Sequence, residues 1–185
     1  MTIATYRWEI DRYHRAVEAG VFENQAVELL RGELVLMSPE GTPHAYYSDR
    51  AARYLRQLLE LPELAYVREA KPITLPNHSE PEPDIAIVQP LDQVYLEHHP
   101  YPENVFWIIE YSQSSLTKDL GIKSKIYAEV GIAQYWVINL KDKQLIVFRD
   151  PEDGEYQSKM VLTEGVITLL SFPNIQVNVR RLITV

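Results

Sequence analysis

A short run in the middle of the chain is apolar at every position and ends in a carboxylate. Residues 105–109 are all aliphatic or aromatic, and Glu110 follows them directly. A run this short, rich in β-branched and aromatic side chains, predicts a strand buried on both faces. The chain is therefore predicted to be an α/β protein in which helices cover the faces of a mixed sheet.

A second apolar strand carries a carboxylate at its other end. Residues 84–88 begin with Asp84, directly after Pro83, and continue with four apolar residues. If the two strands pair antiparallel, Asp84 and Glu110 meet. We expect their carboxylates to lie roughly 4–6 Å apart in the metal-free protein, to repel each other, and to raise the proton affinity of at least one of them. The alternative is that Glu110 is only a solvated or hydrogen-bonded carboxylate at the mouth of a strand.

Hard divalent cations such as Mg²⁺ prefer carboxylate oxygens. A cation between the two acids would offset the cost of placing two anions at the edge of an apolar sheet. The pair therefore predicts a metal site.

The remaining pattern predicts the order of the elements. A tight hairpin is expected around Arg31 and Gly32, and a right-handed parallel crossover should join the strand ending at Tyr111 to the strand ending at Leu140. The expected elements are a helix at 11–20, a helix at 43–60, strands at 65–75, 84–88 and 105–111, a helix at 119–130, a strand at 134–140, and β-structure beyond 145. No domain boundary is evident, so one domain over residues 1–185 is expected.

The helix expected at residues 119–130 brings a lysine to the border of the core. At helical spacing, Ile122, Ile126 and Val130 form the stripe that is predicted to be buried. Lys123 lies beside this stripe, and its long stem should carry the ammonium into the space between the two acids. The alternative is a weak surface ion pair between Asp119 and Lys123.

Composition narrows the classes of protein to which the chain can belong. The formal net charge of −8 argues against a protein that coats nucleic acid, because coating needs many Lys and Arg side chains. The chain has no cysteine, which excludes thiolate metal sites and disulfides. It shows neither a secretion signal nor an apolar run long enough for a membrane span. We therefore expect a soluble cytoplasmic protein without a membrane partner.

These motifs together resemble the Uma family of restriction-endonuclease-like proteins, which belongs to the PD-(D/E)xK nuclease superfamily. The resemblance covers about residues 25–150. It rests on the Pro83-Asp84 pair, residues 109–112, Asp119, Lys123, Tyr127, Gly131, residues 135–136 and, upstream, residues 28–34, Ser38-Pro39 and His44.

The resemblance implies a restriction-endonuclease-like core, with a mixed central sheet flanked by helices and additional β-strands at both ends. It makes Asp84 and Glu110 the ligands of Mg²⁺ or Mn²⁺. The superfamily's usual lysine position holds Ser112 here, and Lys123 matches members whose lysine lies on the following helix. Further candidates for supporting the site are Glu28, His44, Ser112 and Asp119. For His44 the alternative is a residue that only contacts backbone at a helix N-terminus.

The implied activity is Mg²⁺-dependent hydrolysis of phosphodiester bonds in DNA by an endonuclease. By analogy, a homodimer would suit the cutting of two strands. Two alternatives stay open. One is a catalytically degenerate nuclease fold that binds nucleic acid or protein, which Ser112 and the acidic charge keep open. The other is an interaction protein that keeps the carboxylates for structure.

Overall fold

The computed structural model describes residues 5–61 and 63–184. A six-stranded mixed sheet forms its centre, in the order β3-β4-β5-β6-β7-β8. β5 and β6 are parallel, and the other neighbouring strands are antiparallel. The strands are β3 (Tyr66–Glu69), β4 (Ile85–Val88), β5 (Val105–Ser112), β6 (Gln134–Asn139), β7 (Gln144–Glu152) and β8 (Glu155–Leu162). The predicted mixed α/β architecture is confirmed.

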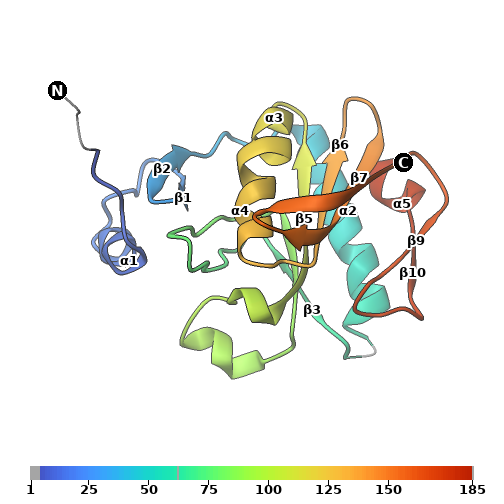
Figure 1. Cartoon of the computed structure of the whole chain (residues 1–185), viewed down its shortest axis with the longest axis horizontal. Helices are drawn as coiled ribbons and strands as arrows, with labels where there is room; N and C mark the ends of the chain where they lie inside the picture. The colour runs from blue at the N-terminus through green and yellow to red at the C-terminus, as the bar shows by residue number, and fades with distance from the viewer. Residues whose placement is uncertain (1–4, 62, 185) are drawn as a thin grey trace.

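Helices cover both faces of the central strands (Figure 1). On one face, α2 (Thr42–Leu59) and α5 (Arg180–Ile183) pack over Trp107 and Trp136. On the other face, α4 (Ser124–Glu129) packs over Ile108 and Tyr135. Because apolar layers lie above and below, every residue of β4 and β6 is buried. This explains why these strands lack the alternation of polar and apolar residues that a one-sided sheet shows.

The crossover between β5 and β6 has the predicted parallel connection, but its helix is not regular. It starts at α3 (Leu116–Lys118), three residues earlier than predicted, and continues through a π-helical segment, η3 (Asp119–Lys123), into α4. A π turn holds more residues than an α turn and shifts the phase of the side chains. Lys123 is consequently 3 % exposed, whereas Ile122 is 37 % exposed. The predicted burial of Ile122 is therefore wrong, because it assumed uninterrupted α-helical spacing.

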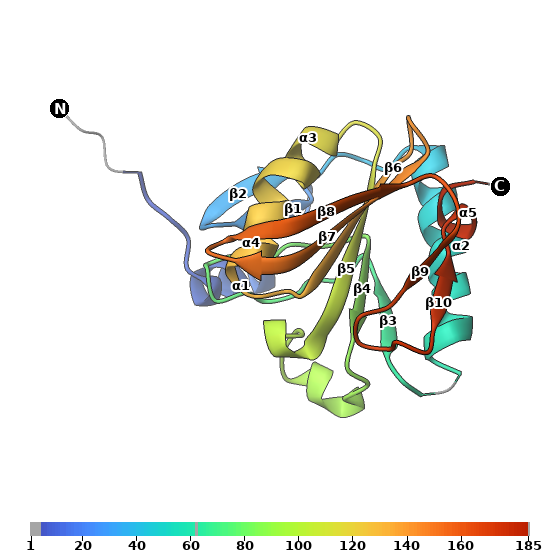
Figure 2. The ribbon, with the colours of Figure 1, turned by 45° about the vertical axis from the view of Figure 1, so that its right-hand side comes forward.

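Two hairpins flank the sheet, which confirms the additional strands expected at both ends (Figure 2). The first pairs β1 (Val27–Leu30) with β2 (Glu33–Leu36), and the second pairs β9 (Val166–Thr168) with β10 (Gln176–Asn178). The first hairpin lies near α1 (Ile10–Glu18) and joins the rest of the chain through an antiparallel bridge between Leu29 and Glu80.

The strand expected at residues 65–75 is shorter than predicted. β3 ends at Glu69 because Ala70 adopts a left-handed φ of 43° and Pro72 follows. A residue with a left-handed φ leaves the extended conformation of a strand, and proline lacks the backbone N–H that a β-ladder needs. Two 3₁₀ helices, η1 (Asp92–Leu96) and η2 (Pro102–Asn104), connect β4 to β5. Within residues 5–61 and 63–184, no helix combines the length and apolarity that crossing a bilayer requires.

The turn of the first hairpin requires glycine for two reasons. Gly32 has φ +77°, and a Cβ there would lie 2.9 Å from Cβ of Arg7 and 3.0 Å from the carbonyl oxygen of Trp8. At Gly165, φ is +90° but no atom lies within 4 Å of such a Cβ.

We expect Gly165→Ala to cost about 1–2 kcal/mol of unfolding free energy through left-handed strain alone. Gly32→Ala should cost roughly 1 kcal/mol more, because the added methyl also clashes with backbone. Urea denaturation of both variants measures the difference. Equal costs would contradict close packing of residues 7 and 8 against the hairpin.

Candidate active site

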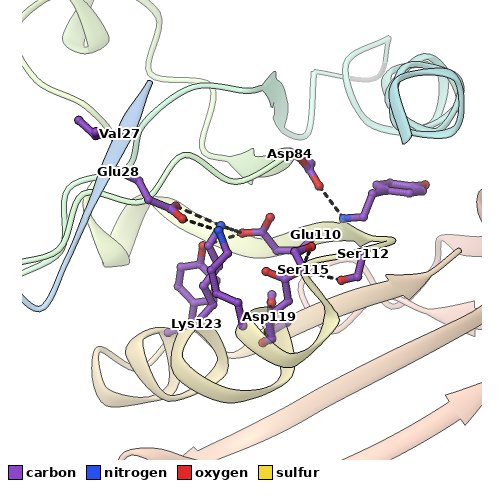
Figure 3. A network of polar contacts seen from close by, with 12 residues as sticks. Val27, Glu28, Asp84, Glu110, Ser112, Ser115, Asp119 and Lys123 are labelled. Atoms are coloured by element: carbon purple, nitrogen blue, oxygen red, sulfur yellow. Dashed lines mark hydrogen bonds and ion pairs between the residues drawn. The ribbon is translucent and has the colours of Figure 1, made fainter. Parts of the chain in front are cut away.

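The register of β4 and β5 brings the two predicted acids together. Ile85 pairs with Ile109 in the antiparallel ladder, so the next residue outward on each strand is Asp84 and Glu110 respectively. Residues directly opposite in such a ladder point to the same face of the sheet. Figure 3 shows both carboxylates on the same side of β5. The backbone N–H of Tyr111 donates a 2.6 Å hydrogen bond to Oδ2 of Asp84, which fixes this carboxylate at the strand end.

A cleft of about 370 Å³ opens above these acids. Its walls come from the first hairpin, the N-terminal end of α2, the end of β5 and the π-helical segment. Every predicted site residue except Ser112 lines it: Glu28, His44, Asp84, Glu110, Asp119 and Lys123. Residues far apart in the sequence are thus gathered around one opening.

Glu110 is held by two donors from the crossover helix. It is 3 % exposed, and its Oε1 accepts hydrogen bonds from Nζ of Lys123 at 2.8 Å and from the hydroxyl of Tyr127 at 2.9 Å. Burial raises the pKa of Glu110 to about 8; the charge of Asp84 adds to this effect and the ammonium of Lys123 opposes it. The expectation that crowding would raise the proton affinity of one acid is met at Glu110, with burial as the larger cause.

Lys123 reaches the acids from the π-helical segment, but not in the expected place. Its ammonium lies between Glu110 and Glu28, 2.8 Å from Oε1 of Glu110 and 3.1 Å from Oε2 of Glu28. The sequence pattern predicts a position between Asp84 and Glu110 instead. Burial alone would lower the pKa of Lys123, but the two glutamates raise it above its ordinary value, so the ammonium stays charged.

Glu28 enters the site from β1, and a second lysine accompanies it. Nζ of Lys118 donates to Oε1 of Glu28 at 2.8 Å. Burial by itself would raise the pKa of Glu28, but Lys123 and Lys118 hold that pKa below its ordinary value. Lys118 escaped sequence analysis because it lies one residue before the predicted helix start. The sequence held no helical signal for it, because Lys118 precedes Lys123 by five residues, a spacing that matches a π turn and not an α turn.

Asp119 and Ser112 join β5 to the crossover helix. Oδ2 of Asp119 accepts hydrogen bonds from the hydroxyls of Ser112 at 2.7 Å and Ser115 at 2.6 Å. Asp119 is only 2 % exposed, so the alternative of a surface ion pair with Lys123 is wrong. Ser112 thus anchors the helix segment that carries Lys123.

His44 connects α2 to the site. Its Nε2 lies 3.0 Å from Oδ2 of Asp84, and its Nδ1 lies 3.6 Å from Oε2 of Glu40. Burial alone would lower the pKa of His44, but the hydrogen bond and charge of Asp84, with the charge of Glu40, raise it to about 9. The sequence did not predict Glu40, because it precedes the helix expected at residues 43–60 and the helical i,i+4 rule does not apply to it.

The donor set fits a hard divalent cation. Among the described residues, hydrogen bonds and ion pairs reach Oδ2 of Asp84 and Oε1 of Glu110, which leaves one oxygen of each carboxylate without such a contact. Carboxylate oxygens are the ligands that Mg²⁺ and Mn²⁺ prefer. Asp84 and Glu110 could therefore hold such an ion without giving up their contacts to the protein.

The raised pKa of Glu110 predicts how stability depends on pH. The folded protein keeps a proton that the unfolded chain releases above its ordinary pKa of about 4.3, so this stabilisation is present at low pH and is lost as pH rises toward about 8. In metal-free buffer, the unfolding free energy of the wild type should fall more between about pH 5 and 8 than that of Glu110→Gln. Urea denaturation at several pH values measures this fall in unfolding free energy. Glu155→Gln, at an exposed glutamate, is the control and should follow the wild type. Parallel pH profiles for wild type and Glu110→Gln would contradict the burial effect.

Comparisons with known proteins agree with this architecture. No curated protein matches the chain. Its fold is similar to the crystal structure of "a putative nuclease belonging to DUF820" from Anabaena variabilis ATCC 29413, with a TM-score of 0.66 and 16 % identity over 85 % of this chain and 89 % of that chain. Residues 10–180 match the family described as "Uma2: Putative restriction endonuclease", which supports a nuclease function. The chain belongs to the Uma2 family.

Proposed function

We propose that this protein is an endonuclease that hydrolyses phosphodiester bonds in DNA with the help of Mg²⁺ or Mn²⁺. One observation carries the proposal. Two strand-end acids, Asp84 and Glu110, share a cleft with a buried ammonium, that of Lys123, which lies 2.8 Å from Glu110. Acids that can hold a cation, next to a fixed positive charge, suit reactions in which a phosphate gains negative charge.

Asp84 and Glu110 would hold the cation. The bound ion would polarise the scissile phosphate and lower the pKa of an attacking water. The protein's contribution is rigidity. Asp84 is fixed by Tyr111 and His44, and Glu110 by Lys123 and Tyr127, so both carboxylates are in place before a ligand arrives.

Lys123 would stabilise the developing charge or orient the attacking water. Its ammonium remains protonated because Glu110 and Glu28 flank it, and burial removes the water that would screen it. Ser112 holds the lysine's helix through Asp119. Although the strand carries Ser112 and no lysine at this position, the following helix places the ammonium of Lys123 at the site.

DNA is the proposed substrate because the description of the family reads "Putative restriction endonuclease". The net charge of −8 favours contact confined to the cleft over broad adhesion to nucleic acid. A degenerate nuclease that binds without cutting is the second candidate. The observation that favours it is the charge balance of Glu28 and Glu110 with Lys118 and Lys123, which needs no metal ion.

Divalent cations should stabilise the folded protein, since they bind a site that the unfolded chain lacks. We expect saturating Mn²⁺ to raise the melting temperature by a few degrees, roughly 2–5 °C, and Asp84→Asn to abolish most of this rise. Asp153→Asn, at an exposed turn, should keep it. Differential scanning fluorimetry makes the measurement. No rise in the wild type would contradict the metal site and favour the interaction-protein alternative.

Lys123→Met should lower Mn²⁺- or Mg²⁺-dependent cleavage of DNA by roughly two or more orders of magnitude, because the charge next to the reacting phosphate is lost. Lys125→Met is the matched control, because Lys125 is 52 % exposed and pairs with Glu155 outside the cleft. Its cleavage rate should stay near that of the wild type in a plasmid-nicking assay.

Since Lys123 also balances two buried glutamates, its removal alone can weaken the fold. The double variant Glu28→Gln/Lys123→Met removes one charge of each sign and keeps the balance. It should fold by circular dichroism and remain inactive. If Lys123→Met and Lys125→Met cleave alike, Lys123 has no catalytic role. Metal binding without cleavage in the wild type would favour the degenerate nuclease.

A further inference from the structure

The two outer strands of the central sheet, β3 and β8, differ in what their free edges contact. Side chains at the end of α2 cover the edge of β3. The backbone N–H of Val67 donates to Oε1 of Glu60 at 2.9 Å, and the carbonyl of Val67 accepts from Nη2 of Arg56 at 3.4 Å. The edge of β3 is therefore closed to another strand.

The edge of β8 has no such cover. Its eight residues form one border of the sheet (Figure 2). Within residues 5–61 and 63–184, the backbone of β8 hydrogen-bonds only to β7 and to the side chain of Gln157 in the same hairpin. An unpaired edge is a template for another strand, and proteins usually protect it with charges, proline, a bulge or a covering segment.

β8 carries little of that protection. It contains no proline, and both of its charged side chains are engaged within their own chain. Glu155 pairs with Lys125 at 3.0 Å. Nζ of Lys159 lies 5.6 Å from the centre of the Phe148 ring, so this ammonium turns back over β7. Neither charge is directed to the free edge.

Two apolar side chains of β8 are exposed. Met160 is 43 % exposed and Val161 is 49 % exposed. Pairing with another strand would satisfy the backbone groups of the edge and remove both side chains from water. In the central sheet, β8 is the strand with a free edge, so a second copy of the chain supplies the edge that this one needs.

Symmetry limits how β8 can pair with itself. In an antiparallel pair of identical strands, a two-fold axis places one residue opposite its own copy. At Lys159 this would oppose two like charges, which destabilises a pair. An axis at Ser158 would place Val161 opposite Glu155, and an axis at Val161 would run the ladder past the end of β8. An axis at Met160 places Val161 opposite Lys159 of the second copy, whose stem can cover it.

We propose that two copies of this chain associate through β8, paired antiparallel about a two-fold axis at Met160. The two six-stranded sheets then form one continuous sheet. Residues 158–162, which pair with β7 without interruption, form the new ladder. None of these residues lines the cleft at Asp84 and Glu110, so the inference goes beyond the proposed function and does not depend on it.

Sedimentation velocity of the full chain at increasing concentration tests the association. The wild type should approach twice the 21.5 kDa of one chain. Val161→Lys places an ammonium opposite Lys159 of the second copy and should weaken dimerisation roughly tenfold or more. Circular dichroism checks that this variant folds. Val94→Lys, at an exposed valine of η1, is the matched control and should dimerise like the wild type.

Single cysteines test the position of the axis, since the chain has no cysteine of its own. Directly opposite residues in an antiparallel pair have Cα atoms about 4.5–5.5 Å apart, which a disulfide can span. Met160→Cys should therefore run as a covalent dimer on a non-reducing gel after oxidation. Val94→Cys should stay a single chain.

A wild type that remains monomeric at every concentration would overturn the proposal. A dimer that Val161→Lys leaves intact, or that Met160→Cys does not cross-link, would also overturn it, because the interface or its axis would then lie elsewhere. Each of these outcomes leaves the metal site and the cleavage of DNA to their own tests.

Discussion

The buried ammonium of Lys123, shared by Glu110 and Glu28, is the interaction on which the site depends. Removing one member of a buried ion pair leaves an uncompensated charge that costs about 3–5 kcal/mol. Here three elements that are distant in the sequence supply the charges: β1 carries Glu28, β5 carries Glu110, and the π-helical segment carries Lys123. The pairing therefore ties the first hairpin and the crossover helix to the C-terminal end of the interior strand β5.

The π-helical segment sets the direction of Lys123. Its irregular turn places Asp119 and Lys123 in the protein interior and leaves Ile122 partly exposed. A long apolar stripe would stabilise the helix more by itself, but would place no charge at the acids. Hydrogen bonds from Ser112 and Ser115 to Asp119 hold this segment against β5. Irregular helix geometry of this kind is frequent at functional sites.

Local patterns in the sequence predicted the features that depend on strands and turns. One apolar run begins at Asp84 and the other ends at Glu110, which predicted an antiparallel pair with adjacent acids. The hairpin at Gly32 and the parallel crossover are also confirmed. Periodicity failed at Ile122 because it presumes one helical repeat throughout. It also missed Lys118, which the π turn and the earlier helix start bring to Glu28.

Long-range packing decided the rest. The hairpin that carries Glu28 joins the rest of the chain through the bridge between Leu29 and Glu80. No local sequence pattern predicts this contact. Likewise, the contact of His44 with Asp84 depends on how α2 crosses the sheet. Such placements follow from the tertiary fold, so the sequence could name these residues as candidates without placing them.

The most direct test of the metal site is a crystal structure of the protein soaked in Mn²⁺, with the ion located by anomalous scattering. A peak about 2.2 Å from an oxygen of Asp84 and from an oxygen of Glu110, with Lys123 still beside Glu110, is the predicted result. A well-occupied peak elsewhere with none between these two acids, or carboxylates that turn away from each other, would contradict it.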